Sequence, residues 1–228
     1  MTTDDCTMSL LINAGLSSEL ESAHFSQGEG VGLYRTEVPF MMRERFPSEQ
    51  EQMELYRTML VDNPDKEITM RTLDVGGDKP LPYFPITEEN PFLGWRGIRL
   101  TLDHPEIFLV QVRGMLRASE GLQNLRIMLP MITSVSEVSE ARRLVRQAFH
   151  EVSEEAKSRG KTIYMPKIGV MLEVPAVIYQ MNLLADKVDF FSVGTNDLTQ
   201  YLLAVDRNNS RVAGLYDSYH PAVLAALV

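Results

Sequence analysis

Short runs of consecutive apolar residues, separated by longer stretches with helical spacing, recur along this 228-residue chain. Such runs predict strands of a parallel sheet, because parallel strands are covered by helices on both faces and need not alternate polar with apolar residues. Strands that alternate with helices in this way predict an α/β fold. Six segments fit: Met8–Asn13, Gly30–Tyr34, Ile68–Leu73, Leu125–Pro130, Ile168–Leu172 and Phe190–Val193.

The segments between these strands carry helix signals. Ser48–Leu60 begins with a good N-cap residue, and Ser134–Arg159 begins with a capping box that Ser134 forms with Glu137. Pro175 suits the first turn of a helix after the fifth strand. The segment Gly76–Arg99 is rich in glycine and proline and too long for a simple connection, so we expect a structured, functional loop there.

Six β-α units in this order predict a (β/α)8 TIM-type barrel that is incomplete. A standard barrel takes eight strands and typically ~250 residues. We interpret residues 1–228 as one truncated barrel domain with about six of the eight units. The alternative is an open sheet, which would leave two strand edges exposed, and natural proteins usually avoid this.

The composition narrows the class of partner. A net charge of −9 argues against a broad nucleic-acid surface, because phosphate backbones need a basic face. The single Cys6 excludes an intramolecular disulfide and fits a reducing compartment. No apolar run approaches the ~20 residues of a membrane helix, and the amino terminus has no basic leader. We therefore expect a cytoplasmic protein without nucleic-acid or membrane partners.

Charged and polar side chains follow four of the predicted strands. The carboxyl ends of the strands in a parallel barrel converge on one face, which holds the active site. We therefore predict that residues distant in the sequence become neighbours there. The residues are Arg35 after the second strand, Arg71 and Asp74 at the third, Glu173 after the fifth, and Asn196 with Asp197 after the sixth.

Two of these residues, Glu173 and Asp197, are carboxylates that end hydrophobic strands. Two oxygen ligands with room for water and substrate oxygens suit Mg²⁺, which rarely receives a complete protein cage. The alternative is that each carboxylate caps the following helix or pairs with an arginine, and Asp197 taken alone fits either role. Together the two carboxylates favour a magnesium site.

The same loops carry basic residues in a protein that is acidic overall. Positive charge against the overall sign indicates an anionic ligand, because the planar fork of arginine grips phosphate or carboxylate at two points and lysine acts as a point charge. The alternative, surface salt bridges, suits Arg35 and Arg71 poorly because each ends a buried strand, whereas Lys79 also fits a simple turn with an exposed lysine. The basic residues are Arg35, Arg71, Lys79, Arg96 and Arg207.

The histidines, the cysteine and the methionines indicate no chemistry. The histidines show no ligand spacing, so we expect them to be structural or solvated, and Cys6 has no nearby base. Met128 and Met131 are expected to fill the core. The four histidines are His24, His104, His150 and His220.

Several long segments resemble enzyme I of the bacterial phosphotransferase system, a member of the phosphoenolpyruvate (PEP)-utilising enzymes. The segments occur in the family's order and spacing from about Gly28 to the end, and YDSYHPAVL is similar to the nitrogen-related branch. They are GLYRTEVPFM, RTLDVGGDK, ENPFLGWRGIR, LRIMLPMI, IGVMLEVPA and FFSVGTNDLTQYLLAVDRNN.

The resemblance implies a (β/α)8 barrel that binds PEP with Mg²⁺ and dimerises. The phosphoryl group would pass to a histidine on a separate amino-terminal domain and then to a histidine-containing phosphocarrier protein, which leaves pyruvate. Glu173 and Asp197 match the metal ligands. Substrate-binding positions are matched by Arg35, Arg71, Arg207, Asn196 and Asp197, with Lys79 and Arg96 at the border of the pocket.

The chain also departs from the family pattern. It has no segment like the one that carries the phosphorylated histidine, and the proton-donating cysteine of the family lies beyond the sixth strand. We therefore expect no catalytic residue in this chain and no turnover of PEP by the chain alone. The alternatives are a fragment of pyruvate phosphate dikinase or PEP synthase, which share part of GTNDLTQ, and a non-catalytic dimerisation or regulatory barrel. AVDR and RTLDVGGDK favour enzyme I.

Overall fold

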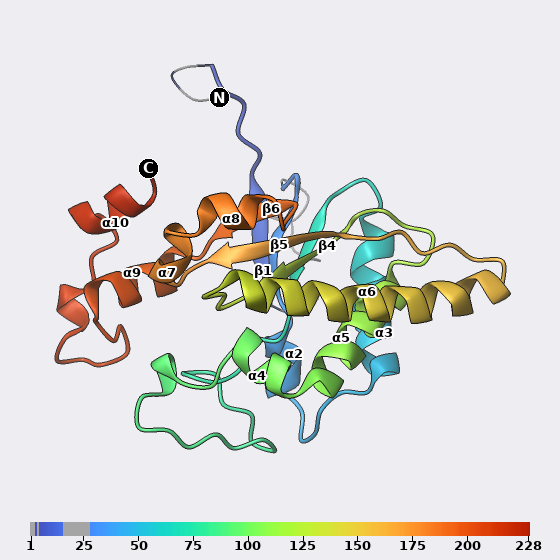
Figure 1. The fold of residues 1–228 in the computed structure, drawn as a ribbon, viewed down its shortest axis with the longest axis horizontal. Helices are drawn as coiled ribbons and strands as arrows, with labels where there is room; N and C mark the ends of the chain where they lie inside the picture. The colour runs from blue at the N-terminus through green and yellow to red at the C-terminus, as the bar shows by residue number, and fades with distance from the viewer. Residues whose placement is uncertain (1–2, 4, 16–27) are drawn as a thin grey trace.

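A single six-stranded sheet organises the chain in the computed structural model, which describes residues 3, 5–15 and 28–228. All neighbouring strands are parallel, and their order in space, β1-β2-β3-β4-β5-β6, equals their order in the sequence. The α/β fold and the partial barrel wall of six units are thus confirmed (Figure 1). The strands are β1 (Leu11–Ala14), β2 (Gly30–Arg35), β3 (Ile68–Arg71), β4 (Leu125–Leu129), β5 (Lys167–Leu172) and β6 (Phe190–Val193).

The six strands differ in burial. β3 is buried along its whole length, and β4 and β5 nearly so, as the continuous apolar runs predict. We expected both faces of every strand to be covered. This is wrong for β1 and β6, in which most residues are exposed or only partly buried. Both lie at the edges of the sheet among the described residues, so each has a neighbouring strand on one side only. β1 also begins at Leu11 rather than at Met8, and β3 ends at Arg71 rather than at Leu73.

Three long helices, α3, α5 and α6, pack side by side on the outer face of the sheet (Figure 1). Their apolar sides bury Tyr56, Phe108 and Val145 against sheet residues such as Ile68 and Ile127, and this forms the main core. No helix within the described ranges is long and apolar enough to cross a membrane. The helices are α2 (Glu37–Met41), α3 (Glu49–Asp62), α4 (Ile98–Asp103), α5 (Pro105–Ala118), α6 (Val135–Ser158), α7 (Pro175–Ile178), α8 (Met181–Ala185), α9 (Thr195–Leu203) and α10 (Pro221–Ala226), with 3-10 turns η2 (Pro91–Leu93) and η3 (Ala213–Leu215).

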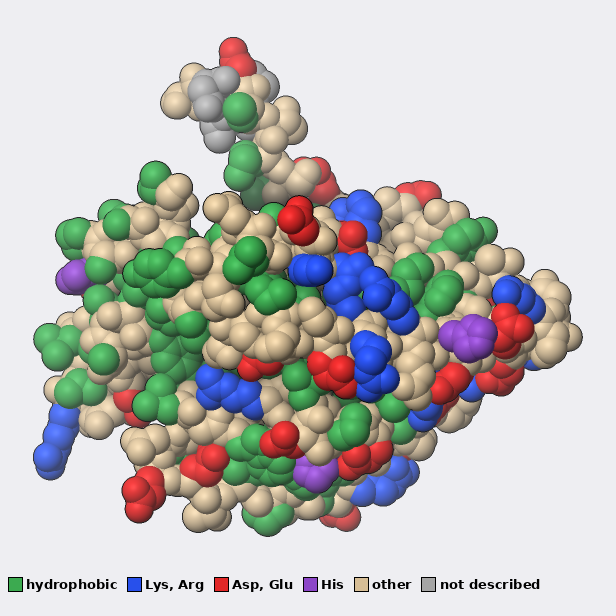
Figure 2. All heavy atoms as spheres, in the orientation of Figure 1, with side chains coloured by type: hydrophobic (Ala, Val, Ile, Leu, Met, Phe, Trp, Pro, Cys, Tyr) green, Lys and Arg blue, Asp and Glu red, His purple; other side chains and the backbone are tan. Residues whose placement is uncertain are grey.

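The surface over α7 to α10 is more apolar than the helical face beside it. Figure 2 shows hydrophobic side chains gathered over that part of the molecule, whereas acidic and basic side chains intermingle over the long helices. Exposed apolar residues in this region are Tyr179, Leu183, Leu215 and Tyr219.

The segment Gly76–Arg99 is ordered, as predicted. It folds on a small core of its own, in which Leu73, Val75 and Leu81 are buried together with Phe40 and Leu100. The segment returns to the sheet at Gly97, whose φ of +57° lies in the region that favours glycine. A Cβ at this position would lie 2.9 Å from a Met131 side-chain carbon, so glycine lets the segment approach the chain just after β4 this closely.

The predicted helix starts are also confirmed. Ser48 and Ser134 each form a capping box with the glutamate three residues later, and Pro175 is the first residue of α7. At α6, the Ser134 backbone N–H donates to Glu137 at 2.9 Å, and the same carboxylate accepts from Thr133.

We expect Ser134→Ala to lower the free energy of unfolding by about 1 kcal/mol, because the first turn of α6 loses its side-chain acceptor. Urea denaturation followed by circular dichroism measures this. The control is Ser139→Ala on an exposed turn of the same helix, where Ser139 only donates to the carbonyl of Val135. Equal losses in both variants would contradict the capping role.

Candidate functional site

A cavity of about 460 Å³ opens at the carboxyl ends of the strands, on the face where the sequence predicts the site. Its walls come from β2, β3, β5, β6 and the first turn of α9, so it gathers side chains that lie far apart in the sequence. Arg96 is fully buried behind this cavity and does not line it. The predicted residues that line it are Arg35, Arg71, Lys79, Glu173, Asn196, Asp197 and Arg207.

Glu173 is a buried carboxylate with a hydrogen-bond partner on only one of its two oxygens. Its side chain is 1% exposed, and Oε1 accepts a hydrogen bond of 2.6 Å from the backbone N–H of Met131. The other oxygen, Oε2, is buried and has no hydrogen-bond partner. The alternative that Glu173 caps α7 is wrong, because Val174 is the N-cap residue and no side chain caps this helix.

Asp197 lies in the first turn of α9 but does not cap it, because Gly194 is the N-cap residue and no side-chain cap is present. Its carboxylate faces two arginines instead. Oδ1 lies 3.3 Å from Arg207 Nη1, and Oδ2 lies 3.5 Å from Arg96 Nη2. Asp197 therefore fits the alternative of pairing with arginine, while it also lines the cavity beside Glu173.

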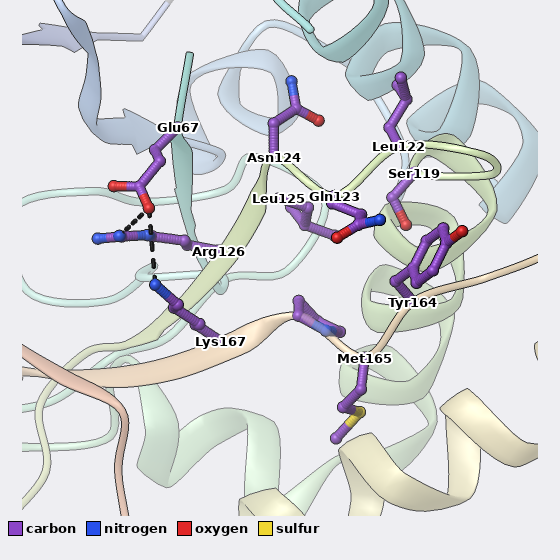
Figure 3. A pocket seen from close by; sticks show the side chains of 11 residues that line it. Glu67, Ser119, Leu122, Gln123, Asn124, Leu125, Arg126, Tyr164, Met165 and Lys167 are labelled. Atoms are coloured by element: carbon purple, nitrogen blue, oxygen red, sulfur yellow. Dashed lines mark hydrogen bonds and ion pairs between the residues drawn. The ribbon is translucent and has the colours of Figure 1, made fainter. Parts of the chain in front are cut away.

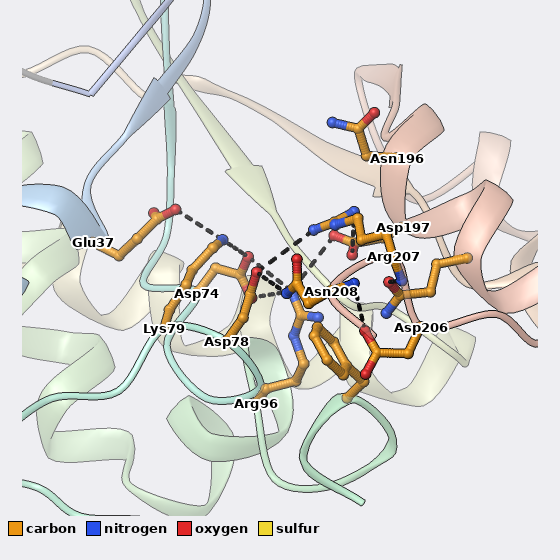
Figure 4. A network of polar contacts seen from close by, with 12 residues as sticks. Glu37, Asp74, Asp78, Lys79, Arg96, Asn196, Asp197, Asp206, Arg207 and Asn208 are labelled. Carbon is orange, nitrogen blue, oxygen red and sulfur yellow. Dashed lines mark hydrogen bonds and ion pairs between the residues drawn. The ribbon is translucent and has the colours of Figure 1, made fainter. Parts of the chain in front are cut away.

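Four charged side chains at the ends of β2 and β3 form a closed ring of alternating sign. Arg71 Nη2 donates to Glu37 Oε1 at 2.5 Å and lies 3.2 Å from Asp74 Oδ2. Lys79 Nζ donates to the same two oxygens, at 3.0 and 2.6 Å. Each charge in the ring thus contacts both charges of opposite sign, and Figure 4 shows Glu37, Lys79 and Asp74 in line.

Arg96 connects this ring to α9. Its Nη2 lies 3.2 Å from Asp74 Oδ2, and its Nη1 donates to the Tyr201 hydroxyl at 3.4 Å. Tyr201 in turn donates to the carbonyl of Phe92. The ring, the Gly76–Arg99 segment and α9 therefore share one network (Figure 4).

Buried polar side chains fix the strand ends that carry this network. The Thr36 hydroxyl donates to the Arg71 carbonyl at 2.7 Å and accepts from Gln111 Nε2 at 3.0 Å. Gln111 also accepts from the backbone N–H of Leu73 at 2.7 Å. Gln111 lies on α5, so the helix behind the sheet sets the position of the strand ends beside the cavity.

The carboxylates at this site differ in their pKa values. Burial disfavours ionised Asp74, but Arg71, Arg96 and Lys79 outweigh it and hold the pKa of Asp74 well below its usual range. Burial, helped by the charges of Asp74 and Asp197, raises the pKa of Glu173 to about 8. Neighbouring carboxylates therefore differ in charge at neutral pH.

Most basic side chains at the site are paired with carboxylates, so they do not add up to an excess of positive charge. Arg71, Lys79 and Arg96 are paired with Glu37 and Asp74, so the salt-bridge alternative applies to them, although these bridges are buried rather than on the surface. Arg35 is the exception: it is exposed in the cavity, and no ion pair joins it to another described residue. Glu37 and Tyr201 are functional candidates that sequence reasoning missed. Only their positions in the sequence pointed to them: Glu37 lies two residues after Arg35, and Tyr201 lies one helical turn after Asp197.

The remaining candidates lie outside the site. His104 contacts Glu106, His220 accepts from the backbone N–H of Ala222, and His150 is exposed, whereas His24 lies outside the described residues. Cys6 is exposed, and Met128 and Met131 are buried in the core as expected. Within the described ranges, no group of three or more His, Cys, Asp or Glu residues has the arrangement of a metal site.

A second cavity, of about 330 Å³, lies at the amino ends of β4 and β5 (Figure 3). There Glu67 Oε1 pairs with Arg126 and lies 3.7 Å from Lys167 Nζ. The amino-end face of a barrel is associated with stability rather than with chemistry. It offers a comparison site in which one carboxylate oxygen also bridges two cations.

Comparisons with protein sequences of known families agree on one family. The profile described as PEP-utilising enzyme, PEP-binding domain, matches residues 1–228. A Salmonella typhimurium protein named phosphoenolpyruvate-dependent phosphotransferase system is 60% identical over 96% of this chain and 29% of its own length. A phosphoenolpyruvate-protein phosphotransferase of Staphylococcus carnosus is 43% identical over 98% of this chain and 39% of its own length. The chain thus spans well under half of these relatives.

Among solved structures, a citrate lyase from Burkholderia xenovorans aligns with 79% of this chain and 56% of its own, at 16% sequence identity and a TM-score of 0.41. This likeness is too low to carry an argument about fold or function.

We expect Asp74→Asn to lower the free energy of unfolding by about 3–5 kcal/mol, because two buried arginines and the part-buried Lys79 would lose their shared carboxylate. Chemical denaturation measures the loss. Asp78→Asn is the matched control, because Asp78 is partly exposed and lies 3.8 Å from Arg207. Its loss should stay within about 1 kcal/mol. Similar losses in the two variants would contradict the central role of Asp74.

A pH dependence follows from the raised pKa of Glu173. In metal-free protein, folded Glu173 keeps its proton up to about pH 8, whereas the unfolded chain releases it near the ordinary value of 4.5. The folded state binds more protons between these values, so its contribution to stability falls as the pH rises, by at most roughly 1.4 kcal/mol per pH unit.

Glu173→Gln lacks this titration and serves as the reference. Urea denaturation of both proteins in EDTA, at several pH values from 5 to 9, should show wild type losing stability relative to the variant up to about pH 8. A stability difference that is constant with pH would show that Glu173 titrates normally.

Proposed function

The chain belongs to the family of PEP-utilising enzymes, in their PEP-binding domain, and we propose that its carboxyl-end cavity binds PEP for phosphoryl transfer to a protein. One observation carries the proposal. A single cavity gathers basic side chains, an amide and two carboxylates from strand ends far apart in the sequence. This combination suits a small ligand that carries both a phosphate and a carboxylate.

The basic residues are proposed to hold the phosphate. Arg35 ends β2, near one edge of the sheet, and Arg207 follows α9, which comes after the edge strand β6. Arg71 and Lys79 line the same cavity. Phosphoryl transfer needs positioned charges more than covalent chemistry from the protein, because negative charge is spread over the transferred oxygens. Guanidinium and ammonium groups fixed by buried carboxylates supply such charges without reorganisation.

Asn196 and Arg96 are proposed to have different roles. Asn196 is exposed at the cavity, and its Oδ1 accepts from the Tyr216 hydroxyl at 3.4 Å, which leaves the amide nitrogen to donate to the substrate. Arg96 is buried behind the cavity and pairs with Asp74 and Asp197. We therefore propose that Arg96 acts through these carboxylates rather than by touching the substrate.

Glu173 and Asp197 are proposed to bind Mg²⁺. Glu173 offers a buried oxygen without a hydrogen-bond partner, and Asp197 lines the same cavity. Two carboxylates suit Mg²⁺, which keeps several positions for water and phosphate oxygens. When bound, Mg²⁺ would supply positive charge at the phosphate and enolate oxygens of the substrate.

The names of the longer relatives suggest which reaction this cavity serves. One of them is named phosphoenolpyruvate-protein phosphotransferase. We propose that the bond between phosphorus and the enol oxygen of PEP breaks, that a histidine nitrogen outside this cavity accepts the phosphoryl group, and that a phosphocarrier protein receives it next. The enolate takes a proton and leaves as pyruvate. No residue of this chain is assigned to either transfer, and dimerisation and the nitrogen-related branch stay predictions.

Isothermal titration calorimetry of this chain with PEP tests the proposal. We expect binding in the presence of Mg²⁺ that weakens strongly in EDTA, and Glu173→Gln should weaken the Mg²⁺-dependent binding by roughly 100-fold or more. Glu120→Gln is the matched control, because Glu120 pairs with Arg159 away from the cavity. No detectable binding of PEP by the wild-type chain, or an unchanged affinity in Glu173→Gln, would refute the proposed site.

A further inference from the structure

Glu37 is a buried carboxylate to which the proposed function gives no role. It begins α2, directly after β2, and its side chain is 1% exposed. It does not line the cavity. Its Oε1 accepts from both Arg71 and Lys79, two basic residues that line the cavity.

The donors of Arg71 differ in their partners. Nη2 donates to Glu37 at 2.5 Å. Among the described residues, Nη1 donates only to the sulfur of Met171, at 3.6 Å, and sulfur is a weak acceptor. Arg71 and Met171 both line the cavity, so Nη1 is the donor that an anion in the cavity can take over.

Asp74 cannot replace Glu37 in this orientation. Its Oδ2 is shared by Lys79 at 2.6 Å, Arg96 at 3.2 Å and Arg71 at 3.2 Å. Of these three contacts, the one with Arg71 is an ion pair without hydrogen-bond geometry, whereas Glu37 accepts a true hydrogen bond from Arg71. The direction of the guanidinium plane thus depends on Glu37.

We propose that Glu37 is a positioning residue that fixes Arg71 and Lys79 so that their free donors face the phosphate of the ligand. The inference rests on the proposed function of the cavity. Glu37 does not touch the substrate in this proposal, but it determines whether Arg71 and Lys79 point toward the phosphate.

Whether Glu37→Gln weakens or tightens anion binding distinguishes a positioning role of Glu37 from a simple effect of its charge. A carboxylate near an anion site repels the anion, so neutralising it should tighten anion binding if charge alone matters. A positioning carboxylate has the opposite effect, because its loss frees Arg71 and Lys79 to turn away. Glu37→Gln keeps the shape of the side chain and removes the charge, so it distinguishes the two.

The experiment measures two properties of the full 228-residue chain in wild type, Glu37→Gln and Glu37→Asp. The first is PEP affinity with Mg²⁺, by titration calorimetry. The second is the NMR signal of the Arg71 Nε–Hε group in ligand-free protein, assigned by its absence in Arg71→Lys. Glu67→Gln is the matched control, because Glu67 Oε1 also bridges two cations, Arg126 and Lys167, but at the opposite end of the sheet.

We expect Glu37→Gln to weaken PEP binding by roughly 10- to 100-fold, with Glu37→Asp in between and Glu67→Gln unchanged. The Arg71 signal should be distinct and slow to exchange in wild type and should move toward that of exposed arginines in Glu37→Gln. Tighter or equal PEP binding in a folded Glu37→Gln variant would overturn the proposal. If Glu37→Gln does not fold, Glu37→Asp decides by the same criteria.

Failure of the proposed function gives a different pattern. If wild-type chain binds no PEP, the proposed site is refuted, and the Arg71 signal alone then decides whether Glu37 positions Arg71. A signal that is the same in wild type and Glu37→Gln overturns the positioning role in that case as well.

Discussion

One buried carboxylate, that of Asp74, holds the carboxyl-end face of the sheet together. Its side chain is 0% exposed, and burying it alone would be very costly. Three cations offset that cost: Arg71 comes from β3, while Lys79 and Arg96 come from the segment that follows. The long segment is thereby fixed to the strand end from which it leaves. The geometry of the cavity wall depends on this single charge.

The alternation of charge also fits the presence of many acids in the proposed anion site. The five basic residues Arg35, Arg71, Lys79, Arg96 and Arg207 are accompanied by the five acidic residues Glu37, Asp74, Asp78, Glu173 and Asp197. A phosphorylated acid that arrives with a divalent cation brings little net charge, so a large positive surplus is unnecessary. What the site needs is donors in fixed directions, and paired cations are more rigid than free ones.

Much of this architecture is readable from local patterns in the sequence. The six strands and both capping boxes follow from short-range rules, and the parallel topology brings the strand-end residues to one face. The partners of those residues are set by long-range packing instead. Glu37 reads as an ordinary acid in a first helical turn, and nothing local shows that Arg96 is buried under Asp197 rather than exposed at the cavity. The sequences of the edge strands β1 and β6 likewise resemble those of central strands. Their exposure depends on which other segments pack beside them, and the local sequence pattern does not contain that information.

Asp74 and Glu173 show how one face can use the same functional group in two ways. Asp74 is surrounded by cations within ion-pair distance, so its charge is satisfied by the protein itself. Glu173 is equally buried, but its one hydrogen-bond donor is the backbone of Met131, held at a φ of 55°, and no cation within the described ranges pairs with it. A carboxyl group that the fold buries with so few favourable partners is more stable in its protonated form, and this is why the pKa of Glu173 is raised. At the proposed magnesium site, a bound cation would favour the ionised form of Glu173 and displace its proton.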